Sequence, residues 1–85
     1  MDIKLEIPDY DPNCGIKYKW ELNFEIEIKS ENNIVILTAN SAGLRSLANH
    51  FLNLAQKEVP SGTHLHFDEY NSLEEGSLGL IIQKE

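Results

Sequence analysis

The longest regular pattern in the chain is an alternation of apolar and polar residues between Tyr18 and Lys29. Every second position is apolar, and the intervening positions are lysine, glutamate or asparagine; the apolar residues are Tyr18, Trp20, Leu22, Phe24, Ile26 and Ile28. A period of two puts these side chains on one face of a β-strand. We therefore predict one long strand over residues 18–29, with a buried face and a solvated face that carries Glu21, Glu25 and Glu27.

Four other short segments have the composition of strands. They are residues 2–7, 34–39, 64–68 and 78–82. The connection between the long strand and residues 34–39 is Ser30-Glu31-Asn32-Asn33. Because asparagine tolerates the left-handed backbone region that tight hairpins need, we predict a β-hairpin here.

One segment has helical rather than strand periodicity. Its apolar residues recur three or four positions apart, at Leu44, Leu47, Ala48, Phe51, Leu54 and Ala55. Asn40 or Ser41 can cap such a helix, and Pro60 requires that it end earlier. We predict that this apolar stripe packs on a sheet, against Trp20, Leu22, Phe24 and Ile26.

The resulting element order is βββαββ, in a single α+β domain that spans residues 1–85. We predict one mostly antiparallel five-stranded sheet with the helix packed on one face. The strand order that we favour is 3-2-1-5-4. It places the apolar last strand inside the sheet and the histidine-bearing strand at an edge.

The chain is acidic, with fourteen Asp and Glu, seven Lys and Arg, and a formal net charge of −7. This charge disfavours binding to nucleic acids and anionic membranes, and it suits a basic protein partner. Cys14 is the only cysteine, which excludes an intrachain disulfide and a cysteine-based metal motif. The sequence has no signal-peptide pattern and no apolar run long enough to cross a bilayer, so we expect a cytoplasmic protein.

The strand over residues 64–68 carries the most distinctive chemistry. It places His64, His66 and Asp68 on one face and Leu65 and Phe67 on the other. The polar face can be simply solvated, it can contact a partner, or it can hold a metal ion. Imidazoles two residues apart on a strand lie about 6.5–7 Å from each other and can converge on one ion, although Asp68 would strain to join them. A small metal-binding protein or metal-dependent enzyme that uses His64 and His66 therefore stays as the alternative.

An acidic loop that contains one tyrosine follows this strand. A tyrosine among carboxylates is typical of protein-contact surfaces, because the ring supplies contact area and the charges steer a basic partner. We predict a partner-binding surface made of His64, His66, Asp68, Glu69, Tyr70, Glu74 and Glu75. The chain has no phosphate-binding loop or serine nucleophile motif, so we predict no catalytic residues, no cofactor and a non-enzymatic role.

Three segments together resemble a known family. They are Ser41-Ala42-Gly43-Leu44-Arg45-Ser46-Leu47-Ala48, the run from Gly62 to Leu73 with its His-x-His-x-Asp core, and Leu80-Ile81-Ile82. Over roughly Ile34 to Lys84 the chain resembles the small bacterial immunity proteins of polymorphic toxin systems, family thirty-two. The resemblance implies a protein that neutralises a toxin made by the same or a neighbouring cell, with a toxin domain as its partner. The resemblance supplies no catalytic residue assignment.

Overall fold

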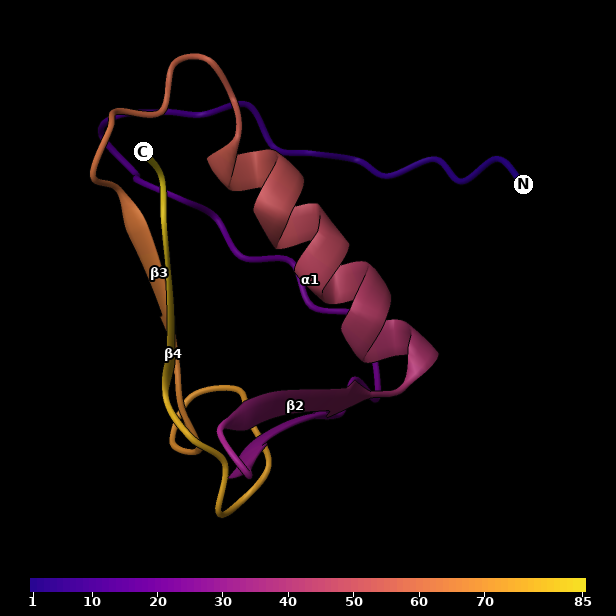
Figure 1. Cartoon of the computed structure of the whole chain (residues 1–85). Coiled ribbons are helices and arrows are strands. Elements are labelled where there is room, and N and C mark those ends of the chain that lie inside the picture. The colour runs from indigo at the N-terminus through magenta and orange to yellow at the C-terminus, as the bar shows by residue number, and fades with distance from the viewer.

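The computed structural model describes residues 1–85 and contains one helix and two separate two-stranded antiparallel sheets (Figure 1). The elements are β1 (Ile26–Glu31), β2 (Ile34–Ala39), α1 (Ser41–Leu54), β3 (His64–Phe67) and β4 (Leu80–Gln83). In Figure 1, α1 lies across from the β3–β4 sheet, and the β1–β2 hairpin closes one end between them. With fourteen residues, α1 is too short to serve as a membrane-spanning helix.

The predicted single five-stranded sheet is wrong. The structure confirms two of the predicted neighbour relations, because β1 pairs with β2 and β3 pairs with β4, both antiparallel. No strand connects the two pairs, however, so each sheet has only two strands. Residues 2–7, which were to form the central strand, contain no strand in the structure. The α+β class is therefore right, and the sheet architecture and the strand order are not.

The predicted strand over residues 18–29 forms only over its last four residues, and β1 then continues to Glu31. The N–H of Phe24 donates to the carbonyl of Glu21 over 3.2 Å, and Asn23 has a positive φ of 63°. This turn interrupts the alternation and leaves Leu22 87% exposed. The rings of Trp20 and Phe24 are stacked, with centroids 4.4 Å apart. The regular strand therefore begins at Ile26.

The predicted hairpin turn is confirmed. Asn32 and Asn33 have φ values of 52° and 65°, which is the geometry of a two-residue turn of type I′. The register pairs Ile28 with Leu37 and Ile26 with Ala39. Since directly paired residues share a face, β1 and β2 present a common apolar side.

The N-terminal segment lies along the polar side of α1 instead of joining a sheet. Four polar side chains near the helix exchange hydrogen bonds with main-chain atoms of this segment. Ser46 accepts from the N–H of Glu21, Asn49 donates to the carbonyl of Glu6, Asn53 donates to that of Lys17, and Gln56 donates to that of Pro8 and accepts from the N–H of Tyr10, at 2.8–3.1 Å. These bonds satisfy backbone groups that strand pairing would otherwise satisfy.

The start of α1 is confirmed, but its predicted packing is not. Asn40 is the N-cap, and its Oδ1 accepts from the N–H groups of Gly43 and Glu25. Within the predicted apolar stripe Leu47 and Leu54 are buried. Leu44, Phe51 and Ala55 are exposed, and Ala48 is partly buried. The buried side of the helix is instead rotated toward its polar residues, because the N-terminal segment covers them.

The core draws on both sheets, the helix and the loops. Eight apolar side chains form it: Ile26, Ile28, Leu47, Leu54, Val59, Leu65, Phe67 and Leu73. His50 is also fully buried, with its ring centroid 4.3 Å from that of Trp20 and 5.3 Å from that of Tyr18. Neither ring nitrogen of His50 has a hydrogen-bond partner. This burial lowers the pKa of His50 to about 4.

Candidate functional site

The predicted alternation of β3 is confirmed. Leu65 and Phe67 are each only 1% exposed, because they belong to the core, and His64 and His66 are exposed. β3 pairs with β4 in a register that sets Leu65 opposite Ile82. The two imidazoles therefore lie on the solvent side of a strand whose other side is firmly packed.

Asp68 follows the end of β3 and belongs to a turn. Its Oδ1 accepts from the N–H of Tyr70 over 2.9 Å, and its Oδ2 lies 3.6 Å from Nε2 of His66. The structure thus brings His66 and Asp68 together. No three His, Cys, Asp or Glu side chains come close enough to hold a metal ion. The geometry gives the metal-site alternative no support.

The acidic loop is ordered by hydrogen bonds within itself. The carbonyl of Asp68 accepts from the N–H of Leu73 over 2.9 Å. The side chain of Asn71 accepts from the N–H of Asp68 and donates to the carbonyl of His66. At the far end, Oε2 of Glu69 accepts from the N–H of Gly76 over 2.7 Å. Two of the predicted contact residues, Asp68 and Glu69, therefore hold the shape of the loop.

The same loop docks on the outer edge of β1. The N–H of Glu74 donates to the carbonyl of Ile26, and the N–H of Leu78 donates to that of Ile28, over 2.9 and 2.8 Å. Leu73 is buried beneath the loop. These contacts fix the backbone of the loop to the body of the protein, so the positions from which its exposed side chains project are set.

Tyr70, Glu74 and Glu75 project from this ordered loop. Tyr70 is 89% exposed, although its backbone N–H is bound by Asp68. Glu74 and Glu75, which follow the buried Leu73 in the sequence, are also exposed. An exposed aromatic ring and two free carboxylates on a fixed loop can contact a protein partner without any rearrangement of the backbone.

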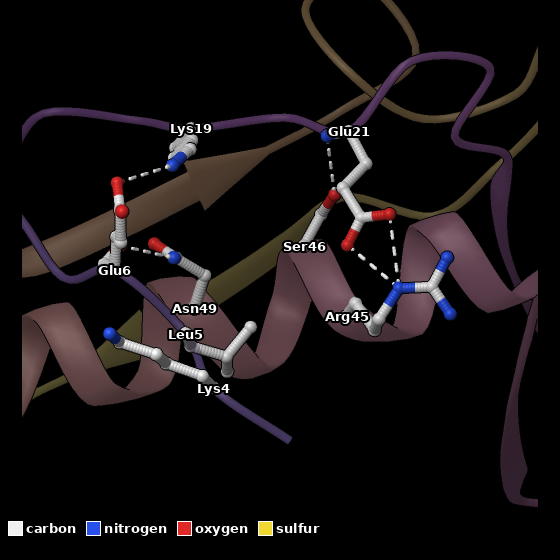
Figure 2. A pocket seen from close by; sticks show the side chains of 8 residues that line it. All are labelled: Lys4, Leu5, Glu6, Lys19, Glu21, Arg45, Ser46 and Asn49. Atoms are coloured by element: carbon white, nitrogen blue, oxygen red, sulfur yellow. Dashed lines mark hydrogen bonds and ion pairs between the residues drawn. The ribbon is translucent and has the colours of Figure 1, made fainter.

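A groove lies between the N-terminal segment and α1, apart from the acidic loop (Figure 2). This groove of about 420 Å³ is lined by Lys4, Leu5, Glu6, Lys19, Glu21, Arg45, Ser46 and Asn49. Most of its charges are already paired, since Nε of Arg45 lies 2.8 Å from the Glu21 carboxylate and Nζ of Lys19 lies 3.6 Å from that of Glu6. The hydrogen bond from Arg45 also lowers the pKa of Glu21.

Sequence reasoning did not find this groove. Its lining comes from three segments that are distant along the chain, and no local spacing connects them. Lys4 is its one charged residue that makes no ion pair. Because most of its charged groups are already paired, the groove is a weaker candidate binding site than the acidic loop.

A comparison with protein families identifies the matched region. The family model described as immunity protein 32 matches residues 34–85, a span that contains β2, α1, β3, the acidic loop and β4. No curated protein and no solved structure shows a significant match to this chain. The family match confirms the resemblance, while the role of the His-x-His-x-Asp run stays a prediction. Because the match covers more than half of its residues, the chain belongs to the immunity protein 32 family.

Proposed function

We propose that this protein neutralises a bacterial toxin by binding the toxin domain directly, through a surface centred on Tyr70, Glu74 and Glu75. Membership of an immunity protein family supports a protein partner of this kind. The observation that carries the choice of surface is the exposure of Tyr70 on a loop whose backbone is held at both ends. An exposed aromatic ring on a rigid loop loses little conformational entropy when it is buried by a partner.

The charge around this loop favours a basic toxin domain. From Glu58 to Glu85 the chain has six acidic residues and one basic residue, Lys84. The ammonium group of Lys84 is held away from the loop by the carbonyls of Gln56 and Val59, at 2.6 and 2.8 Å, and it offsets only one of the six negative charges. The net charge of this region is therefore negative, and it accelerates the approach of a basic surface.

His64, His66, Asp68 and Glu69 take different parts in the proposed surface. The two histidines are exposed beside the loop on β3 and belong to the rim of the contact. Asp68 and Glu69 act mainly by holding the turn, as their hydrogen bonds indicate. The anchor and the rim should affect binding kinetics differently. The aromatic anchor, Tyr70, should slow dissociation, and the rim charges of Glu74 and Glu75 should speed association.

The test uses the wild-type protein and the toxin encoded by the neighbouring gene, with binding kinetics measured at low and high salt. Tyr70→Ala should speed dissociation about tenfold or more. The double reversal Glu74→Lys with Glu75→Lys should slow association most at low salt. The matched control is Asp2→Lys with Asp9→Lys, which makes the same change in net charge at exposed positions outside the loop.

Two results would contradict the proposal. If wild-type protein forms no complex with the toxin, direct neutralisation is wrong. If both loop variants are folded and bind with wild-type kinetics, the loop is only scaffold. Glu25 and Glu27 would then become the next residues to test, whereas Glu21, the third member of the predicted charged face, lies beyond the turn at Asn23 and is paired with Arg45.

A further inference from the structure

Helix α1 exposes most of its apolar side. Its apolar residues cluster on one arc of the helix, and the exposed members are Leu44, Phe51 and Leu52, followed by Ala55 at the C-cap. The opposite arc buries polar side chains, among them Ser46, Asn49 and Asn53. A helix on the surface of a monomer normally has the reverse arrangement. No other segment of the chain therefore packs over the exposed apolar arc.

Strand β2 continues this surface. It is separated from α1 by one residue, Asn40, and its side chains Ile34, Val35, Ile36 and Leu37 are all exposed, with Val35 65% exposed. Four consecutive exposed apolar residues on a strand are unusual, since natural proteins protect edge strands with charges, prolines or covering segments.

The outer edge of β2 is also unpaired. On β1, the carbonyls of Ile26 and Ile28 accept from the acidic loop, so they point away from β2. Backbone direction alternates along an antiparallel pair, and the groups of β2 that face β1 are those of Ile34, Ile36 and Thr38. The N–H and C=O groups of Val35 and Leu37 therefore point outward, where no other segment of the chain bonds them.

The total exposed area is large for a monomer. The chain exposes 6151 Å². A compact monomer of its 9.7 kDa mass exposes about 5,100 Å². Part of the excess of about 1,000 Å² lies in the extended first residues, and β2 and the apolar arc of α1 supply further exposed area. For comparison, each partner in a stable protein complex buries about 800 Å².

The distribution of charge indicates which partner fits. From Asn32 to Gln56 the only charged residue is Arg45, and Glu21 neutralises it. A basic toxin would be attracted to the acidic surfaces elsewhere. Two copies of this chain, each with a net charge of −7, repel each other over most of their surface but not over this segment. The uncharged surface therefore suits a second copy of the chain.

We propose that two copies associate through β2, edge to edge and antiparallel, about a twofold axis at Ile36. Val35 of one copy then pairs with Leu37 of the other, and the free N–H and C=O groups of both strands are satisfied. The product is a four-stranded sheet in the order β1-β2-β2-β1, which is more stable than an isolated two-stranded pair. The same surface of each copy is used, as twofold symmetry requires. The charged side chains of the two β1 strands stay about 14 Å apart, beyond the range of strong repulsion in physiological salt.

The first test measures the mass of the chain alone in solution, by sedimentation and light scattering over a dilution series. We expect twice the monomer mass of 9.7 kDa. Ile36→Lys places two ammonium groups together at the axis and should raise the dissociation constant of the dimer at least about tenfold. Leu22→Lys is the matched control, because Leu22 is exposed and apolar but lies outside this surface. The test uses no toxin, so its outcome is independent of the proposed function.

The second test is a covalent trap. In a Cys14→Ser background, Ile36→Cys should form a disulfide dimer on mild oxidation, because facing residues of a non-hydrogen-bonded pair have Cα atoms about 4.5 Å apart. Leu22→Cys in the same background should not. A wild-type chain that stays monomeric at every concentration, with no trapped dimer, would overturn the proposal. A monomer whose toxin binding is lost in Ile36→Lys would assign this surface to the toxin instead.

Discussion

The free energy of unfolding should fall as the pH drops below 6.5, because His50 is buried without a partner. Its ring is fully enclosed among the rings of Tyr18, Trp20 and Phe67, and no charged group stacks on it. Burial penalises the charged imidazolium and lowers the pKa of His50 from 6.5 to about 4. In the unfolded chain the ring is hydrated, and its pKa returns to about 6.5.

The sign and the size follow from these two pKa values. Above pH 6.5 the ring is neutral in both states, so it adds no pH dependence. Between pH 6.5 and pH 4 the unfolded state binds a proton that the folded state does not, so stability is lost as the pH falls. Between about pH 7.5 and pH 5 this loss amounts to about 2 kcal/mol. The pKa values of Asp11 and Glu21 are lowered by hydrogen bonds from Asn13 and Arg45, so these carboxyls titrate below this range.

The assay is urea unfolding at the two pH values, followed by the fluorescence of Trp20, the only tryptophan. His50→Phe keeps a planar ring and removes the titrating group. The wild type should lose about 2 kcal/mol more than this variant between the two pH values. His64→Gln, which changes an exposed histidine, should behave like the wild type. If His50→Phe loses as much stability as the wild type, His50 is protonated in the folded state and the reasoning from burial is wrong.

Three substitutions test other contacts by thermal or urea unfolding. Gly43→Ala should lower the free energy of unfolding by about 1–3 kcal/mol although alanine favours helices, because a Cβ there would lie 2.6 Å from the carbonyl oxygen of Glu25; a stabilised variant would show that this packing is wrong. Asn40→Ala should cost about 1–2 kcal/mol by removing the helix cap, and an unchanged melting temperature would contradict the capping role. Phe67→Ala should cost about 3–5 kcal/mol, whereas the exposed control Leu22→Ala should change stability by less than about 0.5 kcal/mol.

The features that could be predicted from the sequence depend on residues close together in the chain. The cap at Asn40, the turn at Asn32 and Asn33, and the alternation of His64 to Phe67 each follow from local chemistry, and each is confirmed. The prediction that all strands form one sheet was wrong, because the arrangement of strand pairs depends on contacts between segments distant in the sequence. Residues 2–7 have a strand-like pattern, but Asn49 of α1 and Gln56 just after it compete for the backbone of the N-terminal segment.

The candidate site was predictable in composition and not in detail. The acidic loop and its tyrosine are visible in the sequence, and the structure exposes Tyr70 as that composition suggests. The carboxylates of Asp68 and Glu69 accept hydrogen bonds from the loop backbone, and this role depends on turn geometry that the sequence does not reveal. The apolar stripe of α1 was assigned to the core because its spacing is helical, and spacing alone does not tell which side another segment will cover.

The attachment of the N-terminal segment to α1 does not depend on the exposed side chains of this segment. Asn49, Asn53 and Gln56, all inside the matched family region, donate to main-chain oxygens of residues 6, 17 and 8, which lie outside it. A main-chain oxygen is the same whatever side chain its residue carries. Proline is excluded where an N–H must donate, as at Tyr10 and Glu21, and where φ is positive, as at Asn23. The exposed side chains of the segment can therefore vary while this attachment is kept, whereas Tyr10, Ile16, Trp20 and Phe24 are constrained because they pack against the core.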